Sequence, residues 1–333
     1  MLTLNYQKQR ITLRPGEKWS TTSASDTYRD TGSAELWSIV REIEQGTPWR
    51  EAVGNRYAKT NPWLHQIVTS PKRDLFFRQY PPRPKSRILD VGAGWGQIAL
   101  PLAKAGHNVV ALEPTPERLA FAEAAARQEK CAERMQFLQA DIFDIEFETR
   151  FDLITCIGVL EWVPKFRTGD PHSVQIEFLR RLKNILTPGG QLVIGIENRL
   201  GLKYLLGAAD DHIGVGNIAV YDAALAVTKW RTFSGQELRS FTFTESELKE
   251  LLMAAGFRLF AFHAALPDYK LPEAIIPLTE VNKHFPANPH VLEHDGSNGN
   301  RLSNQAEMES HYRSLARQNV AHAFVPSFFV TAS

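Results

Sequence analysis

From about Arg87 onward, short apolar runs rich in β-branched residues alternate with amphipathic stretches. Such alternation is typical of a mostly parallel sheet that is covered by helices. The apolar runs predict strands at residues 87–91, 108–112, 135–139, 151–157 and 191–196. The amphipathic stretches predict helices at residues 97–105, 116–128 and 173–186. We therefore expect an α/β fold built on an open, doubly wound sheet.

The second half of the chain carries signals that would complete this sheet. Thr244 followed by Glu247 is a capping box ahead of an apolar stretch, and Gly256 lies where the helix would end. Residues 257–263 then predict a strand, and the last apolar run, 327–331, predicts a strand that pairs with it antiparallel. The expected sheet has seven strands, most of them parallel.

Three segments lie outside this pattern. Residues 1–86 form an N-terminal extension or cap with a helical stretch at 34–44, and residues 198–243 are rich in glycine, aspartate and aromatic residues. Residues 268–321 combine several prolines with the polar tract HDGSNGNRLSNQ, which predicts a mobile surface loop. We expect one main domain at 87–333, with the last two segments as insertions after the fifth and sixth strands. The extension and the first insertion are the expected sources of substrate selectivity.

A glycine-rich turn follows the first predicted strand of the main domain. In ILDVGAGWGQ, Asp90 ends the strand and Gly92, Gly94 and Gly96 precede a helix. Glycines let the backbone turn tightly and approach a ligand closely, because no Cβ occupies the space. The dinucleotide fingerprint G-x-G-x-x-G would require a third glycine where Gln97 stands, so a nicotinamide enzyme is disfavoured.

Acidic residues follow the next two predicted strands. Glu113 comes after NVVAL, where a carboxylate can accept both hydrogen bonds of a ribose diol. Asp141 comes after the third strand, where it can accept a hydrogen bond from an adenine amino group while Ile142 packs on the ring. An N-cap or surface-loop role is the alternative for Asp141.

Several ordered motifs together resemble the class I S-adenosylmethionine-dependent methyltransferases: DVGAGWG, LEP, QAD, FDLITCIGVLEWVP and LRRLKNILTPGGQLVIGIEN. The likeness covers residues 87–198 and the closing helix and strands. It implies a Rossmann-like fold, S-adenosyl-L-methionine as cofactor, and Glu161 lining the cofactor and acceptor side. The residues implied to bind the cofactor are Asp90, Gly92, Ala93, Gly94, Gly96, Glu113, Pro114, Asp141, Ile142 and Gly158.

A narrower likeness concerns the acceptor. The stretches NPWLHQIV, IENRLGLKYLLGAADDHIG, TFSGQEL and PDYKLPEAI are similar to methyltransferases of bacterial surface-polysaccharide gene clusters. Residues 214–230 match no pattern of that subgroup. The resemblance implies O-methylation of a sugar or glycan hydroxyl in polysaccharide biosynthesis. The alternatives are a small natural-product or amine acceptor, and a non-catalytic protein that binds S-adenosylmethionine and recruits a partner.

Methyl transfer from a sulfonium mainly requires alignment of the reactants, but a hydroxyl acceptor also needs a base for its proton. The base candidates are Glu161, His172, Asp210, Asp211 and His212. Among them we expect His212, Asp211 and Glu161 to be catalytic, with Glu161 contacting the cofactor rather than acting as base. A polar turn is the alternative interpretation of residues 210–212.

We expect no metal. Asp210, Asp211 and His212 could instead hold a divalent cation, as in some catechol-type methyltransferases, but neighbours in a turn seldom aim three side chains at one point. His290 and His294 have the spacing of helical metal ligands, yet their surroundings predict a solvated loop.

Composition narrows the partners and the compartment. The formal net charge is +1, from 38 basic and 37 acidic residues, which disfavours nucleic acid as partner or substrate. Two cysteines, Cys131 and Cys156, are too few for a disulfide framework, so we expect a cytoplasmic protein. No uncharged run approaches the roughly 18 residues that a membrane span needs.

Overall fold

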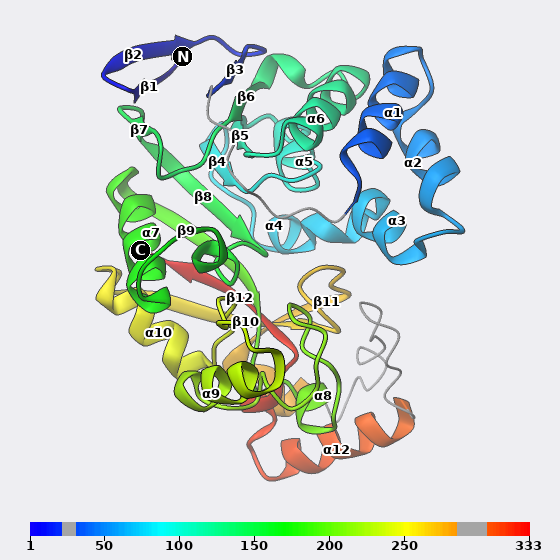
Figure 1. The fold of residues 1–333 in the computed structure, drawn as a ribbon, viewed down its shortest axis with the longest axis vertical. Coiled ribbons are helices and arrows are strands. Elements are labelled where there is room, and N and C mark those ends of the chain that lie inside the picture. The colour runs from blue at the N-terminus through cyan, green and yellow to red at the C-terminus, as the bar shows by residue number, and fades with distance from the viewer. Residues whose placement is uncertain (22–30, 285–304) are drawn as a thin grey trace. The chain divides into compact units, whose positions relative to one another are not determined.

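The computed structural model describes residues 1–21, 31–284 and 305–333 (Figure 1). The chain divides into two compact units. The first unit consists of Met1–Ile157, Arg180–Val193 and Ser333, and the second of Gly158–Leu179 and Ile194–Ala332. The predicted boundary at residues 86 and 87 stays a prediction.

Parallel strands form the centre of the first unit. They are β4 (Arg87–Val91), β5 (Asn108–Leu112), β6 (Met135–Gln139) and β8 (Phe151–Ile157). Strand β4 pairs with β5 and β8, and β5 pairs with β6, in each case parallel. All four strands have the predicted bounds, because parallel strands that are buried on both faces read as continuous apolar runs.

Helices connect these strands, as predicted. Helix α6 (Pro116–Gln128) has the predicted bounds and begins with a proline, whose missing N–H costs nothing at that position. Helix α5 (Ala99–Lys104) begins two residues later than predicted, because the glycine-rich turn continues to that point. Helix α7 (Pro171–Asn184) begins two residues earlier and ends two residues earlier than predicted.

The elements at the end of the chain match their predicted types. Strand β9 (Leu186–Glu197) is longer than predicted at its start, and β10 (Phe260–Leu266) begins three residues later. Strand β12 (Ser327–Ala332) pairs with β10 antiparallel, as expected. Helix α10 (Glu245–Ala254) begins with the capping box of Thr244 and Glu247.

Within the described residues the main sheet has nine strands, in the order β11-β10-β12-β9-β8-β4-β5-β6-β3. The predicted number of seven was wrong. The two additions are short: β3 (Lys18–Ser20) pairs parallel with β6, and β11 (Ala274–Pro277) pairs antiparallel with β10. Each satisfies backbone groups that an edge strand would leave unpaired.

The N-terminal extension contains both strands and helices. Strands β1 (Leu2–Tyr6) and β2 (Gln9–Leu13) form a small antiparallel sheet with β7 (Glu146–Phe147). Helix α1 (Ser33–Glu44), predicted at 34–44, packs against α6 (Figure 1). The strands β1, β2 and β3 of this part were not predicted, and neither were α2 (Trp49–Tyr57), α3 (Pro62–Thr69), the 3-10 turn η1 (Pro71–Asp74) and α4 (Leu75–Gln79).

Both insertions contain regular structure. The first holds α8 (Leu202–Leu205) and α9 (Ala223–Ser234). The second insertion, residues 268–321, was predicted to be a surface loop. In the part that the structure describes this prediction was wrong, because β11, α11 (Val281–His284) and α12 (Gln305–Arg317) lie there. His290 and His294 lie outside the described residues. The remaining 3-10 turns are η2 (Ala132–Arg134), η3 (Val163–Phe166), η4 (Leu278–Glu280) and η6 (Ala321–Phe324).

Among the described residues, no helix combines the length and the apolar character needed to cross a bilayer.

Candidate active site

The glycine-rich turn after β4 adopts the backbone that its sequence predicts. Gly92, Gly94 and Gly96 all have positive φ angles, of 67°, 55° and 85°. A Cβ on Gly96 would lie 3.1 Å from the Cβ of Ala122 and 3.3 Å from Leu100. Glycine is therefore required there both for the turn and for the close approach of α6.

Glu113 ties this turn to the end of β5. One carboxylate oxygen accepts a hydrogen bond from the backbone N–H of Gly94 at 2.8 Å, and the other accepts from Thr115 at 2.9 Å. The side chain is buried. Each carboxylate oxygen still has a lone pair for a further donor, which is what binding a ribose diol requires.

Asp90 presents a buried oxygen that lacks a hydrogen bond. Its Oδ1 accepts a hydrogen bond from the Thr155 hydroxyl at 2.6 Å, whereas Oδ2 has no hydrogen-bond partner among the described residues. Burial raises the pKa of Asp90 to about 7, although the Thr155 hydrogen bond opposes the shift. Such an oxygen is suited to a cationic or hydrogen-bonding group of a ligand.

The other predicted cofactor residues divide between the two units. Asp141 accepts a hydrogen bond from the backbone N–H of Phe143 at 2.9 Å, a contact consistent with the loop role as well as with binding. Ile142 and Ala93 are buried, and Pro114 is partly exposed. Gly158 alone among the ten belongs to the second unit.

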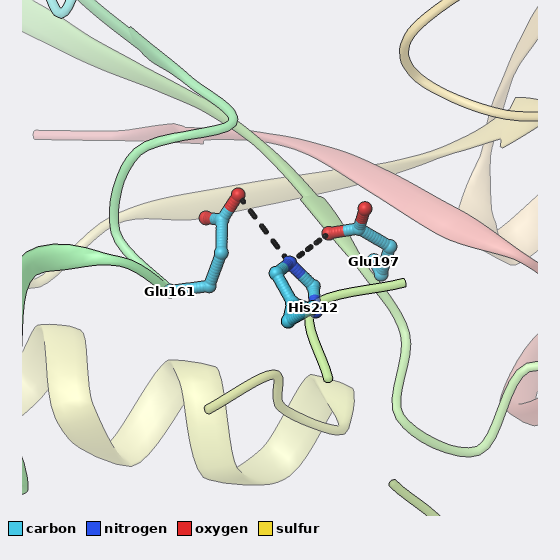
Figure 2. Close-up of side chains that lie close together, drawn as sticks. All are labelled: Glu161, Glu197 and His212. Carbon is cyan, nitrogen blue, oxygen red and sulfur yellow. Dashed lines mark ion pairs between the residues drawn. The ribbon is translucent and has the colours of Figure 1, made fainter. Parts of the chain in front are cut away.

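In the second unit, three acid or base groups from distant parts of the chain converge (Figure 2). Nε2 of His212 lies 3.8 Å from Oε1 of Glu161 and 3.6 Å from Oε2 of Glu197. Glu161 comes from the turn after β8, Glu197 ends β9, and His212 lies in the insertion after α8. Figure 2 shows both carboxylates directed at the same ring nitrogen.

Further charged side chains surround this trio. Nδ1 of His212 lies 3.3 Å from Oδ1 of Asp210, and Lys270 forms a short ion pair with Oε1 of Glu197. Lys203 donates to Asp211 at 2.8 Å. We call these groups, together with Asp268, the buried ion cluster: Glu161, Glu197, Lys203, Asp210, Asp211, His212, Asp268 and Lys270.

Asp211 is thus placed beside the predicted site, but its carboxylate already has two donors. Oδ2 accepts hydrogen bonds from Lys203 and, at 2.9 Å, from the Tyr204 hydroxyl. Asp210 accepts from the backbone N–H groups of His212 and Ile213, as in a polar turn. Asp210 thus lies beside Nδ1 of His212, whereas Asp211 accepts from Lys203 and Tyr204, and the alternative in which these three residues hold a cation stays a prediction.

The charges of the cluster shift its titration. Burial raises the pKa of the Glu161 carboxyl. Burial also opposes the charged form of His212, but Glu197, Asp210 and Glu161 together outweigh it and hold the pKa of His212 well above its ordinary value. Burial likewise disfavours the charged form of Lys270, yet its carboxylate neighbours hold the pKa of Lys270 well above the usual range. The cluster is a set of mutually dependent buried charges.

Local contacts hold Glu161 in place. The side-chain amide of Gln175 donates to the carbonyl of Leu160 at 2.9 Å, and the backbone N–H of Phe241 donates to the carbonyl of Glu161 at 3.3 Å. The ring of Trp162 packs edge-on against His212, with centroids 4.9 Å apart. The side chain of Glu161 is therefore positioned by backbone contacts that do not use its carboxylate.

A cavity of about 300 Å³ in the second unit adjoins the cluster through Asp210. Its lining includes the rings of His172, Phe241 and Phe243; His172 packs on Phe241 with centroids 5.5 Å apart. The polar part of the lining includes Arg199, whose guanidinium forms two hydrogen bonds to Glu247. Rings and planar charged groups thus line one pocket.

Gly158 illustrates how closely this unit is packed. It has a φ of +72°, and a Cβ there would lie 2.9 Å from the hydroxyl oxygen of the buried Tyr269. Gly235 has a similar φ of +70°, and apart from its own chain neighbours no atom of the described residues lies within 4 Å of its Cβ position. Replacing either residue with alanine should cost about 1–2 kcal/mol for the positive φ, and Gly158→Ala about 1–3 kcal/mol more for displacing Tyr269. Urea unfolding of the two variants measures this difference, and equal losses would mean that Tyr269 yields without cost.

Comparison with known proteins decides between the classes of ligand that such sites could bind. A protein-family model described as a methyltransferase domain matches residues 89–194. The tRNA 5-carboxymethoxyuridine methyltransferase of Escherichia coli (strain K12) is 30% identical over 212 residues, which cover 62% of this chain and 75% of that protein. The chain belongs to the class I S-adenosylmethionine-dependent methyltransferases. It is thus an enzyme of that family, and its cofactor is S-adenosylmethionine, as predicted.

Other similar methyltransferases have different acceptors in their names. The ubiquinone biosynthesis O-methyltransferase of Rickettsia akari (strain Hartford) is 33% identical over 123 residues, or 37% of this chain and 45% of that protein. The solved structure of phosphoethanolamine N-methyltransferase 2 from Haemonchus contortus, in complex with S-adenosyl-L-methionine, shares 16% identity at a TM-score of 0.44, covering 88% of this chain and 59% of that one. The tRNA and ubiquinone relatives have different acceptors in their names, so membership of the family gives the reaction but leaves the acceptor open.

The first unit of this methyltransferase fits its cofactor. The glycine-rich turn leaves room beside the backbone, Glu113 keeps lone pairs for a diol, and Oδ2 of Asp90 is buried without a hydrogen-bond partner among the described residues. That oxygen would be satisfied by the ammonium group of the cofactor's methionine part.

The affinity of the methyltransferase for S-adenosylhomocysteine should fall as the pH drops below about 7. The raised pKa of Asp90 means that its carboxyl takes up a proton there, and pairing with an ammonium group requires that proton to leave. The Kd should rise about tenfold per pH unit below the pKa and level off above it. Titration calorimetry across this range measures the slope, which Asp90→Asn should remove. A pH-independent Kd in the unmodified enzyme would show that Asp90 does not pair with the cofactor.

Sequence reasoning missed three members of the buried ion cluster, Glu197, Asp268 and Lys270, the last two of which lie in the same stretch. Glu197 ends the run VIGIE, which was assigned to a strand, and a charged residue in a buried strand was the available signal. Lys270 lies in PDYKLP, a stretch noted only for its resemblance to other methyltransferases. All three lie far along the chain from His212, so no local pattern links them to it.

Proposed function

We propose that this enzyme methylates a hydroxyl group of a sugar or glycan, with Glu161 as the group that accepts the hydroxyl proton. The observation that carries the proposal is the state of the Glu161 side chain. It is fully buried, and neither carboxylate oxygen has a hydrogen-bond partner among the described residues. A buried carboxylate whose oxygens accept no hydrogen bond is costly for stability, so a role in function explains its presence best.

The cavity beside the cluster supports a sugar as the acceptor. A sugar ring has an apolar C–H face, which packs on aromatic rings, and a rim of hydroxyls, which bind planar polar groups. The cavity offers the rings of Phe241, Phe243 and Tyr221 together with Arg199 and polar side chains. Its volume of about 300 Å³ is at the small end for ligand pockets and suits a single sugar unit.

Asp210 connects the cavity to the proposed base. It lines the cavity, and its carboxylate lies 3.3 Å from Nδ1 of His212. The other ring nitrogen faces Glu161 and Glu197. In this proposal His212 positions the two carboxylates, while Asp211 holds Lys203 and belongs to the framework of the site.

In this proposal the first unit binds the cofactor and the second unit acts on the acceptor. S-adenosylmethionine, when bound, supplies a methyl group on a positively charged sulfur. The first unit binds the cofactor through the glycine-rich turn and Glu113. In the second unit, Glu161 would accept the proton that the acceptor hydroxyl loses on methylation.

Incubation with isotopically labelled S-adenosylmethionine and a panel of acceptors tests the proposal. The panel contains monosaccharides, nucleotide sugars, small amines and bulk tRNA, and mass spectrometry identifies the labelled product. Label on an oxygen of a sugar is the expected result. Label on tRNA would instead place this enzyme with its Escherichia coli relative, and label on an amine nitrogen would remove the need for a base.

A further inference from the structure

The trio of Glu161, Glu197 and His212 has the composition of a cation site. Its three ligand atoms, two carboxylate oxygens and Nε2 of the imidazole, all lie within 4.8 Å of one another. Metal bonds of about 2.1 Å place atoms on one ion at most about 4.2 Å apart. The two shorter separations, 3.6 and 3.8 Å, already meet this limit, and at most a few tenths of an ångström of closure completes the set.

The oxygens that face His212 lack hydrogen bonds. Within residues 1–21, 31–284 and 305–333, both oxygens of Glu161 and Oε2 of Glu197 are buried without a hydrogen-bond partner. Both side chains have relative exposures of at most 1%. Buried carboxylate oxygens are almost always satisfied, so these three point to a ligand between them.

The groups behind the trio are those that orient metal ligands. A histidine that binds a metal usually presents its second ring nitrogen to a carboxylate, and Asp210 lies 3.3 Å from Nδ1 of His212. Lys270 occupies Oε1 of Glu197 and leaves Oε2 directed at the imidazole. His212 and Glu197 therefore each have one polar atom held by a neighbouring side chain. The other atom, Nε2 of His212 or Oε2 of Glu197, is left to bind a cation.

The charge balance of the buried ion cluster also favours a cation. It contains five carboxylates but only two ammonium groups, those of Lys203 and Lys270, besides the imidazole of His212. Even when His212 is protonated, the ionised cluster has more negative than positive charge. A divalent cation would offset that surplus, which is costly in a buried site.

We propose that Glu161, Glu197 and His212 bind a divalent first-row transition cation such as Mn²⁺ or Zn²⁺. One imidazole with two carboxylates favours these ions over Mg²⁺ or Ca²⁺, which prefer oxygen ligands alone. Three protein ligands leave a position open, as in catalytic metal sites. At that position the cation would bind the acceptor oxygen and ease loss of its proton; this role rests on the proposed function, whereas binding of the cation does not.

Binding of Mn²⁺ to the full-length chain tests the proposal directly. The protein is treated with a chelator, dialysed and titrated with MnCl₂, and the electron paramagnetic resonance signal of free Mn²⁺ reports binding. We expect one ion per chain, with Kd raised at least about 10-fold by Glu197→Gln and by His212→Ala, because loss of a ligand should cost no less than loss of a group that orients it. Glu237→Gln, which changes an exposed carboxylate of the same unit, should leave Kd unchanged.

Pulsed resonance of the Mn²⁺-loaded unmodified enzyme adds a readout that does not depend on the folding of variants. It should show coupling to an imidazole nitrogen, and His212→Ala should abolish it. Absence of stoichiometric binding, absence of nitrogen coupling, or binding that survives both substitutions would overturn the proposal. If Mn²⁺ binds but no sugar is methylated, the cation site stands and the proposed function fails. If sugars are methylated by an enzyme that binds no Mn²⁺, the proposed function stands and the cation site fails.

Discussion

Replacing Glu161 with glutamine should lower kcat by a factor of about 10² to 10⁴ and leave the affinity for S-adenosylhomocysteine unchanged. Glutamine preserves the size of the side chain but cannot accept a proton from the acceptor. The carboxylate of Glu161 has no hydrogen-bond partner among the described residues, so the substitution removes no hydrogen bond from the fold. Steady-state kinetics with the acceptor found in the panel, combined with calorimetry, measures both quantities.

His212→Ala should also slow turnover without weakening cofactor binding, because His212 lies between Glu161 and Glu197. His311→Ala provides the matched control, since its ring is 45% exposed on helix α12 and pairs only loosely with Glu307. A Glu161→Gln enzyme with full kcat would show that the acceptor proton goes elsewhere. Equal losses of turnover and of cofactor affinity would instead indicate general damage to the structure.

The sequence predicted best what depends on continuous local patterns. Strands β4, β5, β6 and β8 matched to the residue because buried parallel strands are unbroken apolar runs between turns. The capping box at Thr244 succeeded for the same reason, since all its contacts lie within four residues.

The edges of the sheet were missed because their strands have no pattern of their own. Strand β3 is the three-residue run KWS, and β11 is four residues long between prolines and loops. Such strands form because a neighbouring edge offers unpaired backbone groups, which is tertiary information. The helices of the second insertion were masked by the prolines and the polar tract that dominate its composition.

The candidate site was predicted in part for similar reasons. His212 and Glu161 follow recognisable motifs, so the sequence named them as candidates. The sequence could not show that the imidazole of His212 faces Glu197 rather than Asp211. This contact exists because β9 ends, at Glu197, beside the first insertion. Asp211 was a reasonable candidate by position, but Lys203 and Tyr204 occupy its carboxylate.

Replacing Glu113 with alanine should weaken binding of S-adenosylhomocysteine by about 1–3 kcal/mol, which corresponds to a Kd about 5- to 150-fold higher. Two losses contribute. The carboxylate that would bind the ribose diol disappears, and the backbone N–H groups of Gly94 and Thr115 lose their acceptor. Without this acceptor the glycine-rich turn is less ordered in the free protein. Binding of S-adenosylhomocysteine must then also order the turn, which lowers the affinity.

Calorimetry of three variants separates these contributions. Glu113→Gln keeps one oxygen as an acceptor and should lie between the unmodified enzyme and Glu113→Ala. Glu133→Ala removes an exposed carboxylate from the same unit and should bind as the unmodified enzyme does. If Glu113→Ala binds S-adenosylhomocysteine with unchanged affinity, the carboxylate serves only to hold the turn, and the ribose must find its hydrogen-bond acceptors in other residues.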